Sequence, residues 1–113
     1  MTHELKIMPK YFEDVLDGKK NFELRKDDRN FKEGDNILLR EYENGKYTGY
    51  ELFSPIRYIL RDVSEYGLQD GFVILGLDSN VIASQAQALQ QTRMEDTFTQ
   101  MLESEDDPYG NGV

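Results

Sequence analysis

Apolar and polar side chains alternate at the start of the chain and then give way to a helical pattern. Over residues 3–8 the alternation predicts a half-buried strand. Pro9 suits the first position of a helix, where its missing N–H costs nothing, and Gly18 suits a left-handed cap at the helix end. Between them, the spacing predicts a two-turn helix that buries one apolar stripe, formed by Tyr11, Phe12, Val15 and Leu16.

The segment after this helix alternates again. In an extended strand, Phe22 and Leu24 lie on one face, because successive side chains of a strand point to opposite sides. The polar side chains of Asn21, Glu23 and Arg25 then share the other face.

Further strand patterns follow, separated by turn residues. Asn44 and Gly45 predict a type I′ hairpin, because both tolerate positive φ. Pro55 is expected to limit the returning strand to an edge or a break, and residues 66–68 indicate a short helix or anchor. The predicted strands are residues 37–42, about 47–53, 56–60 and 72–77.

Five or six short strands with one helix near the amino end favour a mixed α/β, mainly β fold. Because no βαβ pattern repeats, we expect a small β-barrel domain over residues 1–78. Residues 79–113 form a Gln/Ala-rich and acidic tail whose end has too few apolar groups to fold alone. Within the tail, the spacing of four apolar residues indicates an amphipathic helix: Met94, Phe98, Met101 and Leu102.

Length and composition narrow the function classes. A chain of 113 residues suits one domain. It has no cysteine, which excludes disulfides, thiolate zinc sites and cysteine nucleophiles, and its single histidine, His3, is expected to be a surface or packing residue. No apolar run reaches the length of a membrane span, and residues 1–6 lack the apolar stretch of a signal peptide. We therefore expect a cytoplasmic protein without membrane contact, metal or other cofactor.

Charge is distributed unevenly along the chain. Of the net charge of −9, residues 1–78 carry −4 and residues 79–113 carry −5. Six cations crowd into one short stretch of the first part: Lys19, Lys20, Arg25, Lys26, Arg29 and Lys32. The sequence thus indicates a local basic patch on an acidic chain.

Residues 18–25 read Gly-x-Lys-x-x-Glu-x-Arg, and this segment is the leading candidate for chemistry. Lys20 stands where the predicted helix meets the strand on which Glu23 and Arg25 share a face. Lysine and arginine together can hold a phosphate, and Glu23 can accept hydrogen bonds from a base or sugar, or hold Arg25. Nearby Tyr and Phe residues supply stacking surfaces. The alternative is a surface ion-pair network.

This signature resembles that of the ASCH family, a branch of the PUA-like β-barrels. The similarity covers roughly residues 3–77 and looks like the small bacterial and phage members, which lack an assigned function. It implies a cleft beside the signature and a role in binding RNA or modified nucleosides, with ligand contacts from Lys20, Glu23, Arg25, Arg29 and Lys32. Segments that carry it, besides the signature, are residues 3–7, 28–35, 39–42, 47–49 and 71–75.

The resemblance also implies an enzymatic alternative, since some ASCH proteins remove the acetyl group from acetylated cytidine. In those amidohydrolases a lysine of the signature assists a threonine nucleophile. Lys20 matches the lysine, but Glu23 stands in place of the threonine, and a glutamate beside two cations attacks an amide poorly. Thr48 is the nearest downstream threonine, and nothing in the sequence brings it to the signature.

Three hypotheses follow. The leading one is a non-catalytic module that binds RNA or a nucleotide-like ligand. The second is a small amidohydrolase with Lys20 and Glu23 as its catalytic residues, and the third is an adaptor that binds a protein partner through residues 79–113. Four tyrosines can stack on bases, although most tyrosines of small barrels pack in the core or against hairpins: Tyr42, Tyr47, Tyr50 and Tyr58.

Overall fold

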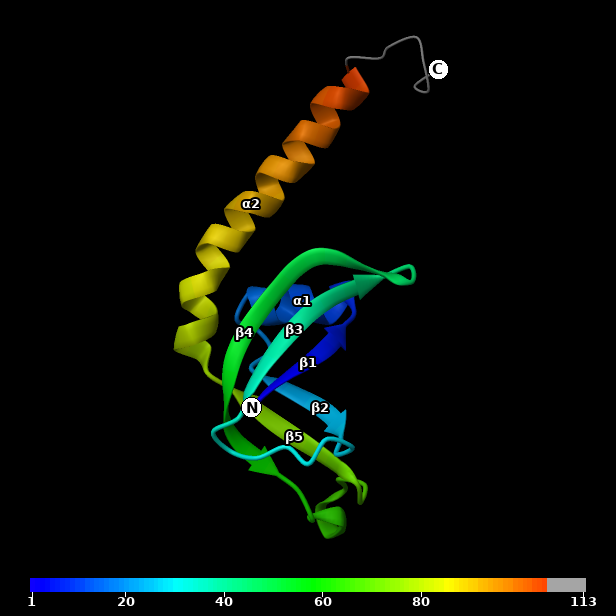
Figure 1. Ribbon diagram of the computed structural model, residues 1–113, viewed down its shortest axis with the longest axis vertical. Helices are drawn as coiled ribbons and strands as arrows, with labels where there is room; N and C mark the ends of the chain where they lie inside the picture. Colours follow the sequence, from blue (N-terminus) through cyan, green and yellow to red (C-terminus); the bar gives the residue numbers. More distant parts are fainter. Residues whose placement is uncertain (106–113) are drawn as a thin grey trace.

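The computed structural model describes residues 1–105 and, within the last helix, side chains as far as Glu95. The fold is mixed α/β and mainly sheet (Figure 1). Its elements in chain order are β1 (Thr2–Ile7), α1 (Pro9–Leu16), β2 (Phe22–Lys26), β3 (Asn36–Glu43), β4 (Lys46–Leu60), the 3-10 turn η1 (Ser64–Tyr66), β5 (Phe72–Leu77) and α2 (Ser79–Glu105).

The five strands form one mixed sheet in the order β1-β3-β4-β5-β2. β1 runs parallel to β3, and the other neighbours are antiparallel. Within the described chain, the outer strands β1 and β2 share no backbone ladder, so the sheet is open and the predicted closed barrel is wrong. Side chains span the opening instead: Arg25 Nη2 donates to the Lys6 carbonyl at 2.7 Å, and Arg29 Nη1 donates to the Glu4 carbonyl at 2.5 Å.

β4 is one strand, whereas the sequence predicted two with a break at Pro55. It pairs with β3 as far as Pro55 and with β5 from Ile56 onward, with a register shift between Ile56 and Tyr58. Proline thus stands where the strand changes partner, and its missing N–H is tolerated there. The predicted hairpin is confirmed, because Asn44 and Gly45 have φ of 53° and 82°.

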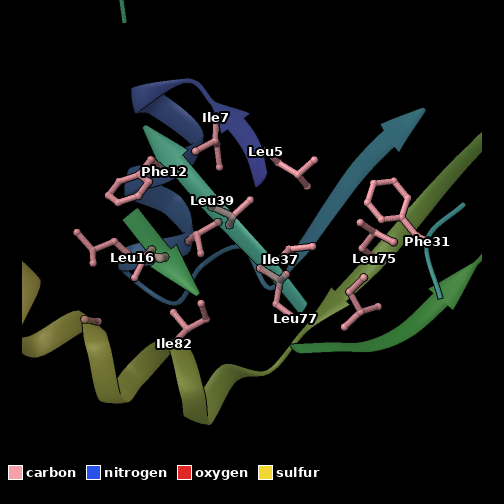
Figure 2. Packing of buried hydrophobic residues seen from close by; sticks show 14 of the residues in the cluster. Leu5, Ile7, Phe12, Leu16, Phe31, Ile37, Leu39, Leu75, Leu77 and Ile82 are labelled. Carbon is pink, nitrogen blue, oxygen red and sulfur yellow. The ribbon is translucent and has the colours of Figure 1, made fainter. Parts of the chain in front are cut away.

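The core lies on one face of the sheet and under both helices. Figure 2 shows side chains from β1, α1, β3, β5 and α2 meeting there. From α1, the buried residues are Phe12, Val15 and Leu16, whereas Tyr11 is 42% exposed, so its predicted burial is wrong. Tyr11 lies at one edge of the stripe and Leu16 at the other, and only the edge with Leu16 is buried.

α2 packs against the sheet at its start and extends beyond it (Figure 1). Ile82 and Ala86 are buried in the core, and Gln85 bonds the backbone N–H and C=O of Phe53 at 2.9 and 2.6 Å. Of the predicted amphipathic stripe, Met94 is 72% exposed, and the other three side chains lie outside the described residues, as does the acidic end. Neither helix, over residues 1–105, has the length and apolar character that a membrane crossing needs.

His3 is a packing residue that ties the start of β1 to the loop before β3. Its Nε2 lies 2.9 Å from Asp35 Oδ2, and its ring meets Phe31 edge-on with centroids 4.8 Å apart. This hydrogen bond is the main cause that lowers the pKa of Asp35 below its ordinary value, with help from the Lys32 N–H and the terminal amine of Met1. The folded protein therefore favours the ionised form of Asp35.

Replacement of the Asp35 carboxyl group is expected to make the free energy of unfolding depend less on pH under acidic conditions. Because the unfolded chain binds the Asp35 proton at a higher pH than the folded one does, the stabilisation is present above the unfolded pKa and is lost as the pH falls through the folded pKa. Between about pH 5 and pH 2, the free energy of unfolding of Asp35→Asn should fall less steeply than that of the wild type. Urea titrations across this range measure it. Asp70→Asn, at an exposed loop position, should keep the wild-type slope, and an equal slope for both variants contradicts the assignment.

Candidate functional site

The turn after α1 determines where Lys20 lies. Gly18 takes φ of 76°, and the N–H groups of Lys19 and Lys20 both donate to the Asp14 carbonyl, at 2.9 and 3.0 Å. These bonds satisfy the end of the helix and direct the chain into β2. The Lys20 side chain therefore starts immediately before the strand that carries Glu23.

β2 turns its charged face inward and its apolar face outward. Glu23 is 3% exposed, whereas Phe22 and Leu24 are 43% and 55% exposed. Both oxygens of the buried carboxylate have cationic partners: Oε1 lies 2.5 Å from Lys20 Nζ, and Oε2 lies 3.1 Å from Arg25 Nε and 3.0 Å from its Nη2. The pairing explains how a strand of this pattern buries a charge.

A pocket of about 750 Å³ opens beside this ion-pair cluster, at the gap between β1 and β2. Four cationic and two anionic residues line it, so the local balance is positive although the chain is acidic. Lys20 Nζ lies 5.7 Å from the ring centroid of Tyr11 and 5.2 Å from that of Phe22. The lining residues are Lys6, Ile7, Met8, Tyr11, Asp14, Lys19, Lys20, Phe22, Glu23, Leu24 and Arg25.

The structure brings three of the five predicted ligand residues together, since Lys20, Glu23 and Arg25 all line the pocket. Arg29 lies at the same opening, where it bonds the Glu4 carbonyl, but it does not line the pocket. Lys32 is exposed and also outside the lining, and its N–H donates to Asp35 at 3.2 Å.

Sequence reasoning missed Tyr11, Phe22, Lys6 and Lys19 as lining residues. The sequence pattern predicts Tyr11 in the core stripe and Phe22 on the strand face opposite Glu23. A usable signal was present, because both aromatic residues flank the signature, one in the helix before it and one inside it. Lys6 could not be found this way, since only the sheet brings β1 to the pocket.

The pocket offers few side chains that could act as a hydroxyl nucleophile or bind a metal ion. The lining residues, all within the described chain, include no serine or threonine. Thr48 lies on β4, where its Oγ1 donates to Glu41 Oε1 at 2.9 Å. Over residues 1–105, the structure holds no cluster of three or more His, Asp or Glu side chains arranged to bind a metal.

Comparison with known proteins identifies the family of this chain and one relative. A family model described as "Domain of unknown function (DUF3850)" matches residues 2–77. The chain belongs to this family. The DUF3850 region contains all five strands, α1 and the whole pocket. An uncharacterised 12.9 kDa protein encoded in the GpA 3′ region of Escherichia phage P2 is 42% identical over 73 residues, which are 65% of this chain and 64% of that protein. The match thus spans less than two thirds of the phage relative's length.

Removal of the buried carboxylate should destabilise the DUF3850 domain. In Glu23→Ala, Lys20 and Arg25 lose the carboxylate that pairs with both of them while they remain mostly buried, at 16% and 24% side-chain exposure. We expect the free energy of unfolding to fall by about 1–3 kcal/mol, as when one partner of a buried charged hydrogen bond is removed. Chemical denaturation monitored by circular dichroism measures this, with Glu65→Ala on η1 as an exposed control. Equal stabilities of the two variants would show that the cluster does not support the fold.

Proposed function

We propose that the pocket between β1 and β2 binds a nucleotide unit of single-stranded RNA or a nucleotide-like ligand without catalysing a reaction. The observation that carries the proposal is the composition of the pocket: two aromatic rings, Tyr11 and Phe22, flank a lysine ammonium group in a positively charged hollow. Aromatic faces bind bases by stacking, and ammonium groups bind phosphate.

The roles of the charged residues follow from the hydrogen-bond donors that their contacts within the protein leave available for a ligand. Lys20 Nζ has three donors and gives one to Glu23, so two are left for a phosphate. Glu23 is too buried to read a base, and the geometry favours the view that it positions Lys20 and Arg25. Lys19 is exposed at the rim and adds a second ammonium group.

The acidic net charge does not oppose this function. Residues 79–113 hold more than half of the excess negative charge, and the pocket lies among residues 6–25. Salt screens exposed charges over about 10 Å at 0.1 M ionic strength, so the four cations that line the pocket act most strongly on a ligand in contact with it. The RNA ligand and the absence of cysteine both fit a cytoplasmic location, which is part of the proposal.

We further propose that this family is related to the ASCH and PUA-like domains. Support comes from the Gly-x-Lys-x-x-Glu-x-Arg signature, whose lysine, glutamate and arginine meet at one pocket beside a five-stranded mixed sheet. This chain then differs from a closed PUA-like barrel, because β1 and β2 do not pair through their backbones. Arginine side chains bridge the opening between the two strands instead.

The amidohydrolase alternative has weaker support. It needs a nucleophile beside Lys20, and the residue at the corresponding position, Glu23, is engaged at both oxygens. Tyr11 carries the one hydroxyl side chain among the lining residues, all of which the structure describes. We therefore favour binding over catalysis. An adaptor role of residues 79–113 stays a prediction.

Titration of a short fluorescent single-stranded RNA tests the proposal. We expect binding that weakens with salt, and a loss of about tenfold for Lys20→Ala because a phosphate contact and the position of Glu23 change together. Lys19→Ala leaves the Glu23 cluster intact. Affinity falls as salt rises, and in this variant the slope of log affinity against log salt should be less steep by roughly 0.7.

Lys32→Ala is the matched control, since Lys32 is also exposed but lies outside the pocket. Its affinity and salt slope should equal those of the wild type. The proposal fails if the wild type does not bind RNA at low salt, or if Lys32→Ala weakens binding as much as Lys19→Ala does. Circular dichroism melts of all three variants separate loss of binding from loss of folding.

A further inference from the structure

A second aromatic and cationic cluster lies on the outward face of the β3–β4 hairpin. Tyr42 and Tyr47 face each other across the strand pair, with ring centroids 5.1 Å apart and planes at 76°. Both rings lie outside the core, and Tyr47 is 41% exposed. We name these two rings the hairpin tyrosines.

Two cations lie over the hairpin tyrosines. Lys6 Nζ is 4.4 Å from the ring centroid of Tyr42 and 5.9 Å from that of Tyr47. The Arg40 guanidinium carbon is 3.8 Å from the Tyr47 centroid, and Arg40 Nε is 3.2 Å from the carboxylate of Glu51. Two cations and the carboxylate of Glu51 thus surround the hairpin tyrosines.

Lys6 connects the hairpin tyrosines to the pocket. It lines the pocket, its carbonyl accepts the hydrogen bond of Arg25, and its ammonium group lies over Tyr42. One strand, β1, therefore separates the pocket from the outer cluster. Lys6 is thus the residue that the pocket, with Tyr11 and Lys20, shares with the hairpin tyrosines.

We propose that the hairpin tyrosines form a second base-stacking subsite, so that the ligand is a single-stranded RNA segment that extends from the pocket across β1. This inference rests on the proposed function, and it extends that function from one nucleotide to several. Alternation of stacking rings with phosphate-binding cations is the arrangement by which single-strand-binding surfaces follow a chain of nucleotides. Lys6 would contact the phosphate between the two stacked bases. A pocket for a free nucleotide needs no second platform.

A length series of oligouridylates tests the inference, from uridine monophosphate to roughly eight nucleotides, within the site sizes of single-strand-binding folds. For the wild type, affinity should rise with length until the second platform is reached. Tyr47→Leu should lose about tenfold of affinity for the long oligomers, the effect of one lost stacking contact, and keep its affinity for the monophosphate. Tyr47→Phe, which keeps the ring, should restore the gain.

Tyr66→Leu is the control, because Tyr66 is 85% exposed on η1, at the other end of the sheet from the hairpin (Figure 1). Its length series should match that of the wild type. If the monophosphate binds and length adds nothing, or if Tyr47→Leu behaves like Tyr66→Leu, the second subsite is wrong and the pocket stands. If neither monophosphate nor oligomer binds, the proposed function falls as well. If a fully paired RNA duplex bound with the same affinity as the single-stranded oligomers, the inference would also be overturned, because paired bases cannot stack on the rings.

Discussion

Arg25 holds the two open edges of the sheet at the distance that makes a pocket. Its guanidinium group bonds the buried carboxylate of Glu23 on its own strand and the carbonyl of Lys6 on β1. A backbone ladder would set β1 and β2 about 4.8 Å apart. A side chain that spans the gap keeps them farther apart and still satisfies a carbonyl of the outer strand. Both the hollow and the charged cluster that lines it depend on this arrangement.

Patterns within one element predicted that element well. The alternation over residues 21–25 put Glu23 and Arg25 on one face of a strand, and the Asn44–Gly45 pair determined a hairpin through the positive φ of both residues. Three of the five predicted ligand residues meet at one pocket, because they belong to one helix-to-strand junction and local geometry brings them together.

What depends on distant segments could not be predicted in this way. Closure of the sheet depends on the separation of β1 and β2, which neither strand encodes alone. Pro55 looked like a break, because the sequence does not show that β4 exchanges one partner for another at that residue. Lys6 reaches the pocket from a strand that precedes the signature, whereas Lys32, close to the signature in sequence, lies outside it.

The bonds of Gln85 have a consequence for how the protein behaves in a concentrated solution. From Lys46 to Pro55, β4 pairs on one side with β3, and β5 begins to pair only at Ile56. Unpaired strand margins recruit other chains and promote aggregation. The amide of Gln85 imitates a peptide group and occupies both the donor and the acceptor of Phe53, near the end of this margin that leads to β5. The first turns of α2 thus cover part of this margin, which disfavours strand pairing between two copies of the chain.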